Sequence, residues 1–149
     1  MRGKGAKLQG WIMTTSRSVS FIALEGAKAL AAAAEAEALK RGWTVAIAVV
    51  DPAGGLVLLH VLDGTQPASQ DIAIEKARTA ARFKRPTKAM EDAVAGGRMS
   101  LLSVSRFALM LEGGVPLTRD GAIIGAIGIS GMTSAQDGEV AAAALASFG

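Results

Sequence analysis

The stretch Gly113–Gly131 reads GGVPLTRDGAIIGAIGISG, and the rest of the chain can be interpreted around it. A glycine pair and a proline open the stretch, and a polar turn follows at Arg119–Gly121. From that turn to Ile129 every residue is apolar or glycine. This order of residues predicts a tight loop and then a hairpin whose second strand is buried.

The residues after the hairpin predict the start of a helix. The strand should break at Ser130–Gly131, and Thr133 stands three residues before Gln136, which is the spacing of a capping box. Ser134, three residues before Asp137, offers a competing cap one residue later. The N–H groups of this helix turn, with those near Gly113–Gly114, are the strongest predicted receptors for a polar ligand.

The composition describes one domain with a core of small aliphatic side chains. The chain has 149 residues, of which 50% are hydrophobic, and it contains four Phe, two Trp, no Tyr and no Cys. This length suffices to bury a core without covalent staples. The absence of cysteine excludes disulfides, thiolate metal sites and cysteine nucleophiles, and it is typical of a cytoplasmic protein.

The net charge of +3 comes from the first residues and not from the folded body. Four basic residues precede Glu25, the first acidic residue, and from Ser18 onward there are 12 basic and 13 acidic residues, a net charge of −1. A nucleic-acid-binding domain carries its positive charge on the folded surface, usually beside aromatic side chains that stack on bases. We therefore expect no nucleic-acid partner.

Residues 1–20 are expected to form a disordered leader or an extension foreign to the native chain, with Met13 as an alternative start. Their only apolar run, residues 11–13, is too short for a secretory signal. No run in the chain reaches the roughly 18 apolar residues of a membrane span, so we also expect no membrane partner. Residues 21–149 then form a single domain.

Hydrophobic periodicity predicts an antiparallel sheet that is covered by helices on both faces. The strand at residues 44–51 is apolar on both faces, and so is the strand at 56–63 apart from His60. A sheet with one wet face would alternate instead. The expected elements are helices at residues 21–42, 69–83, 87–94 and 134–147 and strands at 44–51, 56–63 and 106–112, followed by the hairpin of 113–131.

His60 is the only histidine, and its neighbours on the same strand face are Leu58 and Leu62. A histidine in this setting is most often a core or interface residue bonded to a backbone carbonyl. Metal ligation and acid–base work are the functional alternatives. A zinc site made by the protein alone needs further His or Cys ligands, whereas an axial bond to haem iron needs only one.

Lys76 is the candidate receptor for an acidic group. It lies on the predicted helix at 69–83 and is followed by Ala77, Ala80 and Ala81, so it could be partly desolvated and bind an anion. The simpler interpretation is a solvated charged face. The glycines of Gly125–Gly131 match neither a dinucleotide fingerprint nor a Walker A loop, and close packing of a helix accounts for them as well as a flat ligand does.

The motifs together resemble the GlcG/HbpS family, which also supplies the C-terminal domain of PduO-type proteins. The resemblance runs from about Phe21 to the C-terminus. The segments that carry it are LEGAKAL at 24–30, AVVDPAG at 48–54, LDG at 62–64, DIAIEKARTA at 71–80, GGVPL at 113–117 and IGAIGISG at 124–131, with Asp137. The chain departs from the family pattern at Ala23, Val61 and Met132.

The resemblance implies an α+β sandwich of profilin-like outline, with a five-stranded antiparallel sheet, helices on both faces and assembly into homo-oligomers, dimer or larger. Some members of the family bind haem, and related domains are linked to corrinoid metabolism. Val61 replaces a basic residue of the family pattern, which removes a cation that could pair with an acidic ligand.

Two functions stay open on the sequence. The first is a protein that binds a flat acidic small molecule such as haem or another tetrapyrrole, with His60 as axial ligand. The second is a small cofactor-independent enzyme that acts on a carboxylated metabolite, with Lys76 or His60 as acid or base. The residues expected to bind the ligand are Lys76, Gly113, Gly114, Pro116, Ser130, Gly131 and Thr133.

Overall fold

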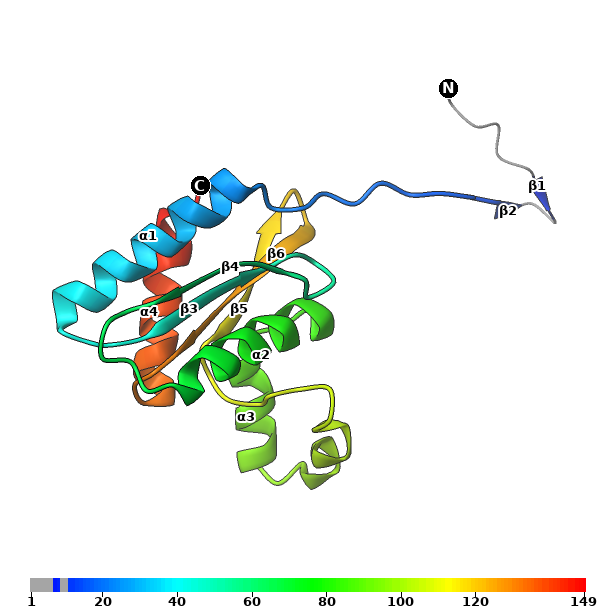
Figure 1. Cartoon of the computed structure of the whole chain (residues 1–149). Coiled ribbons are helices and arrows are strands. Elements are labelled where there is room, and N and C mark those ends of the chain that lie inside the picture. Colours follow the sequence, from blue (N-terminus) through cyan, green and yellow to red (C-terminus); the bar gives the residue numbers. More distant parts are fainter. Residues whose placement is uncertain (1–6, 9–10) are drawn as a thin grey trace.

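The computed structural model describes residues 7, 8 and 11–149 (Figure 1). Two short strands, β1 (Lys7–Leu8) and β2 (Trp11–Ile12), pair with each other away from the body of the protein. Residues 13–23 then reach the first helix without regular structure. The expected leader includes residues 1–6, 9 and 10, which lie outside the described residues, so its disorder stays a prediction.

The body alternates helices and strands in the order that the sequence predicts, with one exception. Its elements are α1 (Leu24–Arg41), β3 (Ala46–Val50), β4 (Leu56–Val61), α2 (Ala68–Phe83), α3 (Thr87–Ala95), the 3-10 helix η1 (Met99–Val104), β5 (Gly114–Arg119), β6 (Ala122–Ser130) and α4 (Ser134–Ser147). Gly42 ends α1 at φ 69°, a left-handed conformation that glycine adopts without strain.

The sheet has four strands in the order β4-β3-β6-β5, and every neighbouring pair is antiparallel. The expected five-stranded sheet is therefore wrong, and the missing strand is the one predicted at 106–112. In that segment the amide of Leu109 donates to Thr79 Oγ1 at 2.8 Å, and the amide of Glu112 donates to Glu91 Oε2 at 2.7 Å. Side chains of α2 and α3 thus accept hydrogen bonds from backbone amides that, in a strand, would donate to a neighbouring strand.

The hairpin predicted from the glycine-rich stretch is confirmed. β5 and β6 are joined by Asp120 and Gly121 alone, at φ 51° and 76°. Two central residues with positive φ match the right-handed twist of the flanking strands. The second strand is buried along nearly its whole length and pairs with β3 on its other side.

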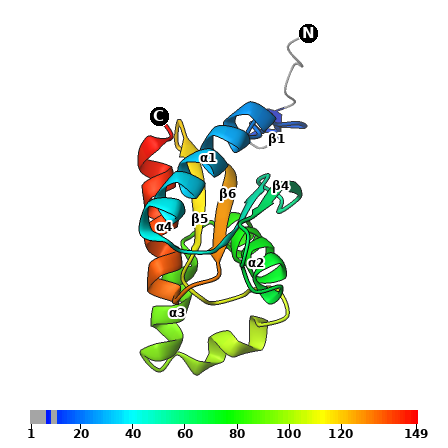
Figure 2. The ribbon, with the colours of Figure 1, turned by 60° about the vertical axis from the view of Figure 1, so that its left-hand side comes forward.

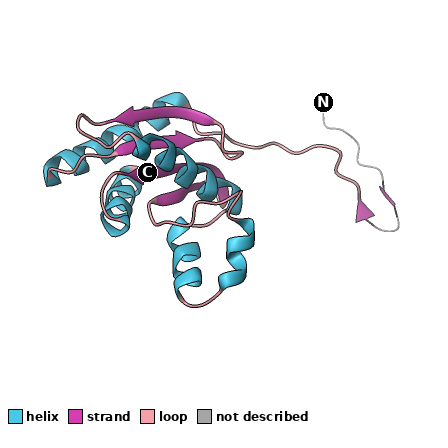
Figure 3. Ribbon diagram, turned by 60° about the horizontal axis from the view of Figure 1, so that its bottom comes forward, coloured by secondary structure: helices cyan, strands magenta, loops and turns pink. Residues whose placement is uncertain are grey.

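Helices cover both faces of the sheet, as the apolar strands predict. Side chains of Val45, Ile47 and Val49 pack toward α1 and α4, and the alternate side chains of β3 pack toward α2. Figure 2 shows the α1–α4 layer and α2 on opposite sides of the strands. The α+β sandwich is thus confirmed, and α3 and η1 project from one end of it, with Thr87 and Met90 of α3 buried (Figure 3).

Alanine and glycine bring α2 very close to the sheet. Ala73 and Ala77 are fully buried, and a Cβ atom added at Gly128 of β6 would collide with the backbone of both residues. Close helix packing therefore explains Gly128. Among the described residues no helix combines the length and the apolar character needed to cross a membrane.

Candidate functional site

Lys76 is buried at the end of β6, where it forms an ion pair with Asp137 of α4. The side chains of both residues are only 2% exposed, and Lys76 Nζ lies 2.9 Å from Asp137 Oδ2. Nζ also donates to the carbonyl of Ile129 at 3.0 Å. The desolvated lysine expected from its alanine neighbours is real, but a carboxylate of the chain itself occupies its charge.

Asp137 also binds a backbone amide in the turn before α4, where the sequence predicts a receptor for a polar ligand. Its second oxygen, Oδ1, accepts the amide of Met132 at 3.0 Å. Burial raises the pKa of the Asp137 carboxyl, while the Lys76 ammonium and the amides of Met132 and Gly131 lower it by a smaller amount. The chain therefore supplies its own anion to this turn.

The glycine pair before β5 is packed and hydrogen-bonded. The amide of Gly114 donates to Thr87 Oγ1 at 2.9 Å, and the carbonyl of Gly113 accepts the amide of Ile129 at 2.9 Å. A Cβ atom at Gly114 would collide with the carbonyl of Lys76. The Gly114 amide, which the sequence predicts as a receptor for a polar ligand, is thus already bonded to a threonine of α3.

Thr133 caps α4 with the predicted capping box. Its hydroxyl accepts the amide of Gln136 at 3.2 Å, and the Gln136 side chain accepts the amide of Thr133 at 3.2 Å. Ser134 with Asp137 does not form the competing cap, because Thr133 is the N-cap and the Asp137 carboxylate accepts Lys76 and the amide of Met132.

The structure brings most of the expected ligand-binding residues together around the Lys76–Asp137 pair. Pro116 lies two residues along β5 from Gly114 and pairs with Ala126, and Ser130 pairs with Ala46 and is buried. His60 is separate from this cluster, on the far edge strand of the sheet. Whether any of the cluster contacts a ligand stays a prediction. The clustered residues are Lys76, Gly113, Gly114, Gly131 and Thr133.

His60 pairs with a glutamate that the sequence does not single out. Its Nδ1 lies 3.0 Å from Glu35 Oε1 of α1, and the two side chains are 39% and 35% exposed. When Nδ1 carries the proton and donates to the carboxylate, Nε2 is left with a lone pair. A carboxylate that orients a histidine in this way is a common feature of metal-ligating histidines.

The surroundings of His60 fit haem better than a bare metal ion. Within the described part of the chain no three His, Cys, Asp or Glu side chains gather closely enough to hold a metal. Haem contains four nitrogen ligands for its iron, so the protein needs to supply only an axial ligand. The half-exposed ring of His60, fixed through Nδ1, meets that requirement.

Glu35 and Asp137 are the residues that sequence reasoning missed as parts of a site. Glu35 belongs to the polar side of α1 and is 25 residues from His60, and Asp137 is 61 residues from Lys76. For Asp137 the signal was present as a helix cap, but its buried partner depends on how α2 and α4 meet. No local pattern connects Glu35 to His60.

Comparison with known proteins agrees with this fold. A family model described as haem degrading protein HbpS-like matches residues 22–146. Protein GlcG of Escherichia coli strain K12 is 48% identical over 104 residues, which span 70% of this chain and 77% of GlcG.

Two solved structures are similar in both fold and sequence. A double mutant of Streptomyces reticuli HbpS matches with a TM-score of 0.83 and 32% identity, over 97% of this chain and 98% of HbpS. PduOC, solved as a complex with haem, matches with a TM-score of 0.76 and 30% identity, over 85% of this chain and 94% of PduOC. With the family match and the identity to GlcG, they confirm the resemblance seen in the sequence: the chain belongs to the HbpS-like family.

Proposed function

We propose that this protein binds a flat acidic small molecule, haem or another tetrapyrrole such as a corrinoid, with His60 as the axial ligand. The observation that carries the proposal is the contact between Glu35 and His60, which fixes one ring nitrogen and leaves the other available. The family description and the haem complex of PduOC support the same class of ligand.

In this proposal, residues of α1 and β4 have different roles at the His60 site. Glu35 orients the imidazole from α1, and β4 presents the ring at the open edge of the sheet. Leu58 lies two residues earlier on the same strand, and Leu39, one helical turn after Glu35, is 67% exposed. Leu39 gives a flat ring system an exposed apolar side chain to cover, and Leu58 packs against the core beside it. Haem, when bound, supplies the iron whose axial position an imidazole nitrogen can fill.

The Lys76–Asp137 cluster is assigned a supporting role in this proposal. Lys76 and Asp137 are nearly inaccessible, and the adjoining glycines are in close backbone contact. Direct contact of these residues with a ligand stays a prediction, which a substitution at Gly114 can test. We further propose a homo-oligomer, a dimer or larger, because side chains such as Phe21, Leu39 and Phe107 are more than half exposed. The absence of cysteine supports a cytoplasmic location.

A second candidate function uses the same pair of residues. A histidine held by a carboxylate is also the usual arrangement of a general base, which supports a small cofactor-independent enzyme acting on a carboxylated metabolite. His60 suits this role better than Lys76, because Lys76 is 2% exposed and already paired with Asp137. An enzyme of this kind would process its substrate without haem.

Titration with haemin, followed by visible spectroscopy, tests the proposal. The wild type should develop an iron-ligand spectrum at a defined stoichiometry, and His60→Ala should lose those bands while keeping its far-ultraviolet circular dichroism. Lys28→Gln, an exposed substitution on the same helix as Glu35, is the matched control and should behave as the wild type. Identical spectra for His60→Ala and the wild type would remove His60 as the ligand.

A further inference from the structure

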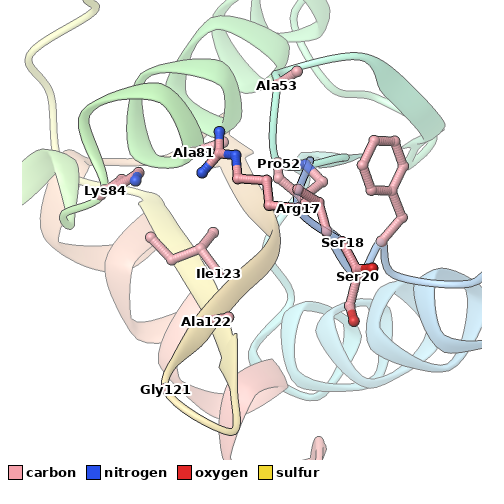
Figure 4. Close-up of a pocket in the computed structure, with 12 residues that line it drawn as sticks. Arg17, Ser18, Ser20, Pro52, Ala53, Ala81, Lys84, Gly121, Ala122 and Ile123 are labelled. Atoms are coloured by element: carbon pink, nitrogen blue, oxygen red, sulfur yellow. The ribbon is translucent and has the colours of Figure 1, made fainter. Parts of the chain in front are cut away.

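A cavity of about 680 Å³ lies at the end of the sheet opposite to His60, where the chain enters the domain (Figure 4). Residues 17–21 form one wall, the turn between β3 and β4 forms another, and the end of α2 and the β5–β6 turn close the rest. Its volume falls within the roughly 300–1,000 Å³ of typical small-molecule sites. The Glu35–His60 pair takes no part in it.

The entering segment is held in place by its last residue. Ile22 is buried, and its amide donates to the carbonyl of Ile124 in β6 at 2.8 Å. The Ile22 side chain also packs over Gly125, where a Cβ atom would lie 3.0 Å from it. Ile22 therefore fixes the place where the preceding residues, 17–21, reach the sheet. These residues form a wall of the cavity.

The charged side chains that line the cavity are both cations, Arg17 and Lys84. Figure 4 shows the Arg17 guanidinium extending toward Ala81, on the side where Lys84 ends α2. Within the described part of the chain, neither side chain makes a hydrogen bond or an ion pair. Two unpaired cations around one cavity produce a positive potential that attracts an anion.

One acid that adjoins the cavity wall is bonded within its own turn. Asp51 precedes Pro52 of the cavity wall, but its Oδ1 accepts the amides of Ala53 and Gly55 at 2.8 and 3.0 Å. Arg82, the residue before Phe83 at the end of α2, donates to the carbonyl of Ala53 at 2.9 Å and so braces the same turn. Hydrogen bonds within the protein thus stabilise this turn of the wall, and Arg17 and Lys84 take no part in them.

The remaining surface of the cavity is largely apolar. Val19 and Phe21 are 52% and 59% exposed, and Ala81 and Ile123 contribute further apolar lining. The cavity is lined by no His, Cys or Met side chain of the described residues, so it lacks the usual axial ligands of haem. It therefore suits an organic anion without a metal.

We propose that this cavity is a second ligand site, which binds a small organic acid. The carboxylate of the acid is held between Arg17 and Lys84, and its apolar body contacts Phe21 and Ile123. The proposal is independent of haem and of His60.

Binding of benzoate, with benzyl alcohol as the neutral analogue, tests the proposal by competition against the fluorescent apolar anion 1-anilinonaphthalene-8-sulfonate. Benzoate should displace the probe from the wild type, and benzyl alcohol should do so much more weakly. Because a charge-assisted hydrogen bond contributes about 1.5–3 kcal/mol, Arg17→Gln and Lys84→Gln should each weaken benzoate about tenfold or more. Lys28→Gln, a cation on α1 away from the cavity, should leave the affinity unchanged.

A filling substitution separates cavity binding from general attraction to positive charge. Ala122 is exposed at the first position of β6 and lines the cavity, so Ala122→Phe should be tolerated by the fold and should block benzoate with both cations in place. His60→Ala should bind benzoate as the wild type does. Failure of benzoate to bind the wild type, full affinity in Arg17→Gln and Ala122→Phe, or loss of affinity in His60→Ala would overturn the proposal.

Discussion

Among the side-chain pairs that join a nitrogen base to a carboxylate, Lys76–Asp137 and Glu35–His60 differ in what they leave unbonded. In Lys76–Asp137 the lysine also bonds a carbonyl and the aspartate also bonds a backbone amide, and both side chains are 2% exposed. In Glu35–His60 one ring nitrogen is bonded and the pair is more than one-third exposed. The first pair is satisfied within the chain, whereas the second leaves one ring nitrogen without a bonded partner among the described residues.

Removing one partner of the buried pair should give the largest decrease in the free energy of unfolding, and it tests the structural role of the pair. Asp137→Ala or Lys76→Met leaves one buried charge without its partner, and each should lower the free energy of unfolding by about 3–5 kcal/mol in urea titrations. The double variant Lys76→Met/Asp137→Leu should recover most of that loss, because replacing a whole buried pair with apolar residues is often near neutral.

Lys88→Met is the matched control for the buried pair. Lys88 pairs with Asp92 at 3.2 Å, but their side chains are 55% and 61% exposed. Loss of this surface pair should change the unfolding free energy by less than about 1 kcal/mol. A similarly small change in Asp137→Ala would show that the buried pair is not structural.

A change at Gly114 should come next in size, and it examines the packing beside the buried pair. Gly114→Ala places a Cβ atom against the carbonyl of Lys76 and the methyl of Thr87, so we expect a loss of about 1–3 kcal/mol in unfolding free energy. Gly26→Ala is the control, since its Cβ atom meets only the Ile22 and Phe148 side chains. A ligand-dependent loss in Gly114→Ala without any loss of stability would instead place the ligand at this glycine.

Weakening the exposed pair should give the smallest effect on folding and a specific effect on binding. Removing the partner of a metal-ligating histidine typically lowers metal affinity about 10–100-fold, so Glu35→Gln should weaken haemin binding by that factor. Unfolding free energy should change by less than about 1 kcal/mol, because the pair is partly exposed to solvent. The comparison between the two pairs fails if Glu35→Gln unfolds the protein or leaves haemin affinity unaltered.

Local chemistry explains which parts of this fold could be predicted from sequence. The β5–β6 hairpin depends on Asp120 and Gly121, whose turn conformation is set by neighbouring residues. The cap of α4 depends on Thr133 and Gln136, which are three residues apart. Each of these features is encoded within a few positions, and each was predicted.

Features that depend on distant partners could not be predicted in this way. The segment at 106–112 alternates like a strand, yet Thr79 and Glu91 bind its amides from two helices. Lys76 was recognisable as a desolvated lysine, but its partner Asp137 is known only once α2 and α4 are placed. The sequence thus located a polar cluster correctly and could not say that the chain satisfies it internally.

The two edges of the sheet offer unequal routes to polymerisation. The edge of β5 is blocked at Gly114, which exchanges hydrogen bonds with Thr87, and at Pro116, which has no N–H to donate. β4 is the other edge and contains no proline, so strand addition is less obstructed on that side. Pairing of two β4 edges would consume both, and a twofold ribbon closes instead of extending into a fibre.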